Sequence, residues 1–133
     1  MELSVDHKGN VAVLGIDGKL DGSNFKELID KAQELIDAGA QNILLDMGKC
    51  SFMSSAGLVS LHSIALMLRG EAPPDPEHGW GAYRSIGQSK ESGKQQHLKL
   101  LNVPGFVQKV LETTGMTAFF ESYTDLDEAL ASF

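Results

Sequence analysis

The chain has 133 residues, of which 42% are hydrophobic and 22% charged, and its formal net charge is −7. These proportions are typical of a globular protein that buries a core, and the length most simply makes one domain over residues 1–133. The acidic balance argues against nucleic-acid binding, which needs a basic surface. The single cysteine, Cys50, excludes an internal disulfide and is usual in a reducing compartment. No apolar run approaches the roughly 18 residues of a membrane span and no signal sequence is recognisable, so we expect a cytoplasmic protein.

The first forty residues predict a hairpin followed by a helix. An alternating pattern at the N-terminus and the apolar run Val11–Ile16 are separated by a Lys-Gly-Asn turn signal, which predicts two paired strands over residues 3–17. A loop over residues 18–24 follows, with Ser23 or Asn24 as the cap of a helix. Apolar residues then recur at spacings of three and four from Phe25 to Ile36, and Gly39 ends this helix.

The middle of the chain predicts a buried strand, a short loop and a second helix. Residues 42–47 are apolar and bounded by polar residues, as in a strand that is covered on both faces. The helix that begins near Ser55 has apolar residues around most of its surface and ends at Gly70. Residues 71–95 hold three of the chain's prolines and four glycines and show no period, which predicts an insert within the domain.

Regular patterns return in the last third of the chain. Residues 97–101 predict a strand, and Pro104 opens a helix that Gly115 ends. The apolar face expected for this helix consists of Phe106, Val107, Val110 and Leu111. Phe119-Phe120 predicts a short edge strand, and Asp125 caps a last helix with Leu126, Ala129, Leu130 and Phe133 as its apolar residues. Strands and helices alternate through most of this order, which predicts an α/β layer domain.

The segment Ser51-Phe-Met-Ser-Ser-Ala-Gly-Leu58 is the candidate functional site. It joins the buried strand to the second helix, whose first turn has unpaired backbone N–H groups and the positive end of the helix dipole. Serine is a preferred cap, so Ser54 and Ser55 could simply begin the helix. The alternative is covalent: a phosphate on Ser55 would be tolerated there and would change what docks on this surface.

A hydrolase has the same strand–turn–serine–helix context. Its motif is Gly-x-Ser-x-Gly, whereas this chain reads Met53-Ser-Ser-Ala-Gly57 and holds only the second glycine. A catalytic triad also needs an oriented histidine, and we interpret all four histidines as structural or solvated: His7, His62, His78 and His97. Neither metal-ligand spacing nor a phosphate-binding glycine motif is present. We therefore expect no enzyme, no metal and no cofactor.

Four segments, in order, resemble the bacterial anti-sigma-factor antagonists of the STAS domain family. The strongest is Ser54-Ser-Ala-Gly-Leu58, which follows a buried strand as the family's Asp-Ser-Ser/Thr/Ala-Gly-Leu stretch does. Gly18-Lys-Leu-Asp21 is similar to the family's Gly-x-Leu-Asp, Val110–Met116 to the end of its third helix, and Asp125–Leu130 to its last helix. The resemblance covers residues 3–70 and 96–133. It implies a mixed sheet of four or five strands with helices packed around it.

The resemblance also implies a function, which is partner switching. Ser55 takes the place of the family's phosphoacceptor. The unphosphorylated domain binds an anti-sigma factor that is itself a serine kinase, phosphorylation by that kinase with ATP breaks the complex, and a serine/threonine phosphatase restores it. The partner-binding residues implied are Asp21, Gly22, Ser23, Ser54, Ala56, Gly57 and Leu58.

Two departures and one rival function accompany this interpretation. Ser54 replaces the family's common aspartate, and the insert at 71–95 stands where the family has a short loop. The rival is a STAS protein that is not a sigma regulator, namely the accessory subunit of a lipid-transport ATPase or a scaffold in a stress-signalling assembly.

Overall fold

The structure is a computed structural model that describes residues 1–70 and 95–133, so the predicted insert lies outside the described residues except for Gln95. Five strands are present: β1 (Glu2–Lys8), β2 (Val11–Leu20), β3 (Asn42–Met53), β4 (Leu98–Leu101) and β5 (Ser122–Tyr123). The helices are α1 (Phe25–Asp37), α2 (Ser55–Leu68), α4 (Gly105–Thr113) and α5 (Leu126–Ala131), and η2 (Met116–Ala118) is a short 3-10 helix.

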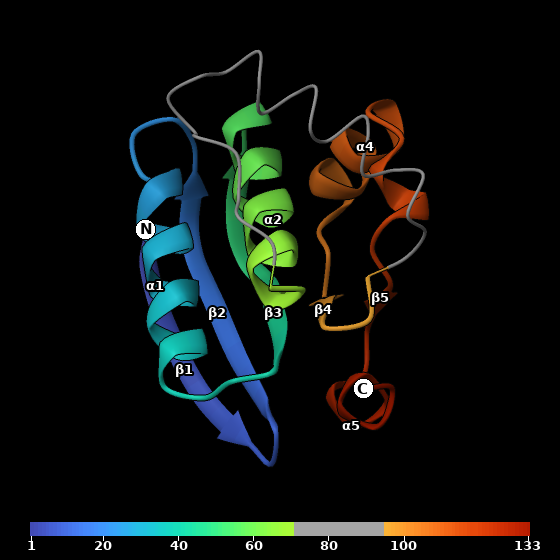
Figure 1. The fold of residues 1–133 in the computed structure, drawn as a ribbon. Helices are drawn as coiled ribbons and strands as arrows, with labels where there is room; N and C mark the ends of the chain where they lie inside the picture. The colour runs from blue at the N-terminus through green and yellow to red at the C-terminus, as the bar shows by residue number, and fades with distance from the viewer. Residues whose placement is uncertain (71–94) are drawn as a thin grey trace.

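The strands form one mixed sheet in the order β1-β2-β3-β4-β5. β1 pairs with β2 antiparallel, and the other three pairs are parallel. The prediction of a mixed sheet surrounded by helices is therefore confirmed. Helices α1 and α2 lie side by side over one face of the sheet (Figure 1). Since β2 and β3 run parallel and each is followed by a helix, the N-termini of α1 and α2 lie at the same carboxyl edge of the sheet.

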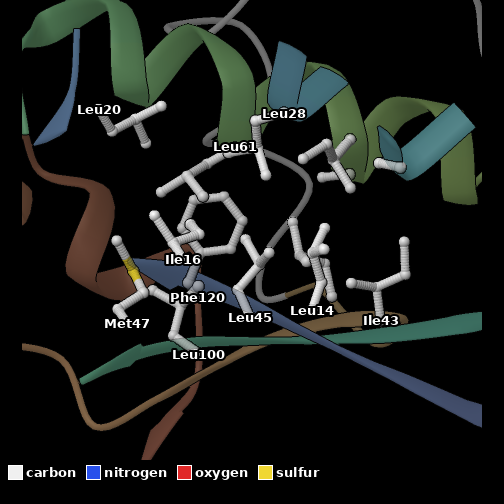
Figure 2. Packing of buried hydrophobic residues seen from close by; sticks show 14 of the residues in the cluster. Leu14, Ile16, Leu20, Leu28, Ile43, Leu45, Met47, Leu61, Leu100 and Phe120 are labelled. Atoms are coloured by element: carbon white, nitrogen blue, oxygen red, sulfur yellow. The ribbon is translucent and has the colours of Figure 1, made fainter. Parts of the chain in front are cut away.

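The main core lies between this face of the sheet and the helices. Leu14 and Ile16 of β2 point toward Leu28 of α1 and Leu61 of α2, with Leu45 of β3 beside them (Figure 2). All five side chains are at most 1% exposed. Fully burying one such side chain contributes about 1.5–3 kcal/mol, so this layer is what holds α2 on the strands.

The opposite face of the sheet has a smaller apolar cluster under α5. Ala129 of that helix packs against Val11, Leu44 and Leu101. Lys99 of β4 projects into the same side, where it is 5% exposed. Its Nζ lies 2.9 Å from a carboxylate oxygen of Glu121 and donates to the carbonyl oxygen of Ser132 over 2.8 Å. The end of α5 is thereby tied to the sheet.

The structure corrects several predicted details. Phe119-Phe120 does not form the edge strand, because these side chains are 2% and 3% exposed and stack edge-to-face in the core. The edge strand is β5 instead. Phe106 and Leu126, expected on apolar helix faces, are 42% and 37% exposed. The reason in each case is tertiary: the space available against the sheet decides which aromatic or aliphatic side chain is buried.

The strand before the candidate site also differs from the prediction. We expected it to end at Met47 and a short loop to follow, but β3 continues to Met53 and β2 continues to Leu20, and the two strands stay paired to their ends with two register shifts on the way. The predicted loop is reduced to Ser54 alone. Polar residues such as Lys49 hide this extension in the sequence, because the second half of β3 is exposed at four of its six positions from Gly48 to Met53.

Candidate functional site

The two serines at the start of α2 have different structural roles. Ser54 is the N-cap: its Oγ accepts a hydrogen bond from the N–H of Ala56 over 3.2 Å, and its carbonyl oxygen accepts from the N–H of Gly57 over 2.9 Å. Ser55 is the first residue of the helix and is exposed. Capping therefore accounts for Ser54 and leaves the Ser55 hydroxyl at the surface.

Asp21 lies in the turn between β2 and α1, at the same edge of the sheet. Its carboxylate oxygen accepts from the Ser23 N–H over 2.9 Å and from the Ser23 hydroxyl over 2.5 Å. These two hydrogen bonds hold the pKa of Asp21 below its usual range, and the bond from the Ser23 hydroxyl has the larger effect. The site therefore carries a fixed negative charge at neutral pH.

Asn24 holds this turn together. Its side-chain oxygen accepts from the Asp21 N–H over 3.0 Å, and its Nδ2 donates to the carbonyl oxygen of Lys19 over 2.8 Å. Asn24 precedes α1 as predicted, but its side chain bonds to the turn and not to the helix. Sequence reasoning missed this role, although asparagine in turns commonly bonds to nearby backbone in this way.

Some of the remaining predicted site residues lie at the surface and others are buried. Gly22 is exposed and Ala56 is half-buried. Gly57 and Leu58 lie below the surface, with Leu58 only 2% exposed. A Cβ on Gly57 would stand 2.4 Å from Cγ of Met53, so this glycine is what lets α2 approach the end of β3 closely.

Among the described residues, neither His62 nor His97 lies beside Ser55. His62 is buried on α2, and burial, followed by the charge of Arg69, lowers its pKa to about 4. His62 follows Ser55 by seven positions in the helix, which corresponds to roughly 10 Å along the helix axis. His97 bonds to the side-chain oxygen of Asn42 at the opposite end of β3, and His78 lies outside the described residues. Burial raises the pKa of the Cys50 thiol, which donates to a backbone oxygen.

Residues 1–70 and 95–133 contain no group of three or more His, Cys, Asp or Glu side chains placed to hold a metal ion. No helix among them has the length and hydropathy needed to cross a membrane.

Comparisons with known proteins find relatives of this chain. The STAS domain family model matches residues 2–71, just over half of the 133 residues, including the Asp21 turn and the start of α2. BtrV of Bordetella bronchiseptica, a candidate anti-sigma factor antagonist, is 23% identical over 100% of this chain and 95% of its own.

Two solved structures have the same fold. An anti-sigma factor antagonist from Mycobacterium paratuberculosis has a TM-score of 0.67 at 17% identity, covering 98% of this chain and 92% of its own. The Bacillus cell fate determinant SpoIIAA, in its phosphorylated form, has a TM-score of 0.56 at 20% identity, covering 98% of this chain and 97% of its own. These structures share the fold, and the family model, which matches more than half of the residues, shows that the chain belongs to the STAS domain family.

Proposed function

We propose that this protein is an anti-sigma-factor antagonist that works by phosphorylation-controlled partner switching, with Ser55 as the phosphoacceptor. With Ser55 unmodified, the protein binds a serine-kinase anti-sigma factor and so frees the sigma factor. Phosphorylation by that kinase dissolves the complex, and a serine/threonine phosphatase reverses the modification. The names of its relatives support this role, as does the existence of SpoIIAA in phosphorylated and unphosphorylated forms.

The exposed position of Ser55 at the head of α2 is the observation that carries the proposal. A kinase must bring the serine oxygen in line with the γ-phosphate of ATP. The Ser55 oxygen then bonds to phosphorus and loses its proton, and ADP leaves. Ser54 is the poorer acceptor because it is half-buried and its oxygen already caps the helix.

The electrostatics of the edge explain how one phosphate could release a partner. It would add roughly −1.5 to −2 charges at a helix N-terminus, where the free protein tolerates them. In an interface that already faces the Asp21 carboxylate, unpaired charge of that size would cost several kcal/mol through repulsion and desolvation. A few kcal/mol corresponds to roughly a hundredfold or more in affinity.

The docking surface follows from this placement. In this proposal the partner contacts Asp21, Gly22, Ser23, Ser54 and Ala56 around Ser55, while the buried Gly57 and Leu58 support the start of the helix. In this proposal the protein is a binding module and not an enzyme. It acts in the cytoplasm, where ATP, the kinase and the sigma factor meet.

The test is a phosphorylation assay with the purified serine-kinase anti-sigma factor of the same cell and ATP. We expect one phosphate per chain, placed on Ser55 by peptide mass spectrometry, and none on the Ser55→Ala variant. Ser55→Asp should lose binding to the ADP-loaded kinase while its circular dichroism spectrum stays native, and Ser55→Ala should bind without being released by ATP.

Phosphate on another residue, or none, would count against the proposal. A Ser55→Asp variant that binds the kinase as tightly as wild type would also contradict it. Stable co-purification with a transporter ATPase in place of a kinase would favour the accessory-subunit function.

A further inference from the structure

The ends of β2 and β3 form a two-stranded ribbon that projects past its neighbours. Its pairs run from Gly18–Cys50 to Leu20–Met53. The pairing of β1 with β2 stops at Asp17, and the pairing of β3 with β4 stops at Asp46. Among the described strands, the ribbon therefore has no third partner, and it leads directly into Ser54 and Ser55.

An irregularity in this ribbon turns one aromatic side chain outward. The register shifts between Gly18 and Lys19, so that Ser51 has no opposite residue and Phe52 pairs with Lys19. Met53 points into the core and is 3% exposed, and Phe52 therefore points to the other face, where it is 46% exposed. Bulges of this kind near functional sites commonly re-aim a side chain.

Two lysines lie on the same face of the sheet as Phe52. Lys19 lies opposite Phe52, and Lys49 lies further down the same face, paired with Asp17; both lysines are exposed. Carboxylates accompany Lys49: Asp17 is its partner on β2. A recess of about 290 Å³ in the sheet is lined by Lys49 together with Glu2, Asp17 and Asp46, so Lys19 is the cation that stands directly beside Phe52.

We propose that Phe52, with Lys19 beside it, is an anchor for the same kinase that docks at Ser55, and that it enters an apolar recess rimmed by carboxylates on that kinase. The inference rests on the proposed function. It is argued from continuity: Phe52 precedes Ser55 by three residues, and the Leu20–Ser54 hydrogen bond of 2.9 Å joins the ribbon to the cap of α2. The kinase would then contact Ser55 at the start of α2 and Phe52 on the opposite face of the sheet.

The energetics favour such an anchor. A serine hydroxyl that must be released after modification supplies little affinity by itself. Binding energy at interfaces concentrates in a few aromatic or arginine side chains that become fully desolvated, surrounded by a polar rim. Phe52 is the most exposed of the three large hydrophobic side chains with substantial exposure in the described residues, and it is the nearest of them to Ser55 in the chain.

The experiment measures the Kd of the full chain for the ADP-loaded kinase that phosphorylates Ser55. We expect Phe52→Ser to raise the Kd by about 10- to 30-fold and Phe52→Leu, which keeps an apolar group, by less. Lys19→Glu should also raise the Kd, and more so at low salt, because it places like charges together. The matched control is Phe106→Ser, which removes an aromatic ring of similar exposure, 42%, from α4.

The outcomes separate this inference from the proposed function. If wild type binds and Ser55→Asp does not, but Phe52→Ser and Phe106→Ser bind equally well, the anchor is wrong and the switch stands. If wild type does not bind the kinase, both are overturned. Should Phe52→Ser prove unfolded by circular dichroism, Phe52→Leu and Lys19→Glu decide the question, and wild-type affinity in both would overturn the anchor.

Discussion

The backbone N–H of Ser54 donates a hydrogen bond to the carbonyl oxygen of Leu20 over 2.9 Å. This bond connects the last residue of β2 to the cap of α2, although 34 positions separate the two residues in the chain. Asp21 follows Leu20 and Ser55 follows Ser54, so the ionised carboxylate and the candidate phosphoacceptor are attached to one rigid pair of strands. A charge added to Ser55 would therefore act beside Asp21 without any rearrangement of the fold.

The cap at Ser54 can be tested by comparing two substitutions. Ser54→Ala removes the acceptor for the Ala56 N–H and should lower the free energy of unfolding by about 1 kcal/mol. Ser54→Asp keeps an acceptor and adds a negative charge at the helix N-terminus, so it should be at least as stable as wild type. Urea denaturation measures both. Ser51→Ala, at an exposed position in β3, is the control and should change stability by less than about 0.5 kcal/mol.

Gly57→Ala should destabilise the protein although alanine favours helices. The added Cβ would lie 2.4 Å from Cγ of Met53 and 3.1 Å from a methyl carbon of Leu20, so the buried Met53 side chain must repack or α2 must move away from β3. We expect a loss of about 1–3 kcal/mol in urea denaturation. The matched control is Gly105→Ala in α4, where nothing lies within 4 Å of the added carbon. Equal effects of the two substitutions would contradict close packing at Gly57.

Burial of His62 predicts that stability depends on pH. The folded protein binds a proton at His62 only near pH 4, whereas the unfolded chain does so near its ordinary pKa of 6.5. Stability from this residue is therefore complete above pH 6.5 and is lost as the pH falls toward 4, by on the order of 2–3 kcal/mol.

The measurement is the free energy of unfolding at several pH values for wild type and His62→Leu. Carboxylates titrate alike in the two proteins, so the difference in slope between pH 6.5 and 4 reports His62. Parallel curves would show that His62 does not resist protonation in the folded state.

Lys99 should control how firmly α5 is held. Lys99→Met keeps most of the stem but removes the ion pair with Glu121 and the two hydrogen bonds to Ser132. Glu121 is partly exposed, with a side-chain exposure of 34%, so we expect a loss of about 1–3 kcal/mol, less than for a fully buried pair. Hydrogen exchange should accelerate in α5 before it does in α2. Lys109→Met, at an exposed position on α4, serves as the control, and unchanged exchange in α5 would refute the anchoring role.

Local patterns predicted the start of α2 better than they predicted the strands that lead to it. The capping preference of serine and the apolar period of α2 correctly indicate that a helix begins at Ser55. The Asp21–Ser23 contact spans two residues and follows the ordinary chemistry of aspartate in turns. The length of β3 and the outward turn of Phe52 were not predictable, because they depend on pairing with β2.

The amino-acid sequence by itself determined the alternation of strands and helices and the capped start of α2, because each depends on residues within a few positions of one another. It also determined the family of the chain, because four such local segments occur in the family's order. Only the tertiary structure decided which side chains face solvent at the edge: Phe52 outward, Leu58 and the Phe119-Phe120 pair inward. The physical reason is that burial is settled by distant segments competing for the same space against the sheet, and no local pattern records the outcome of that competition.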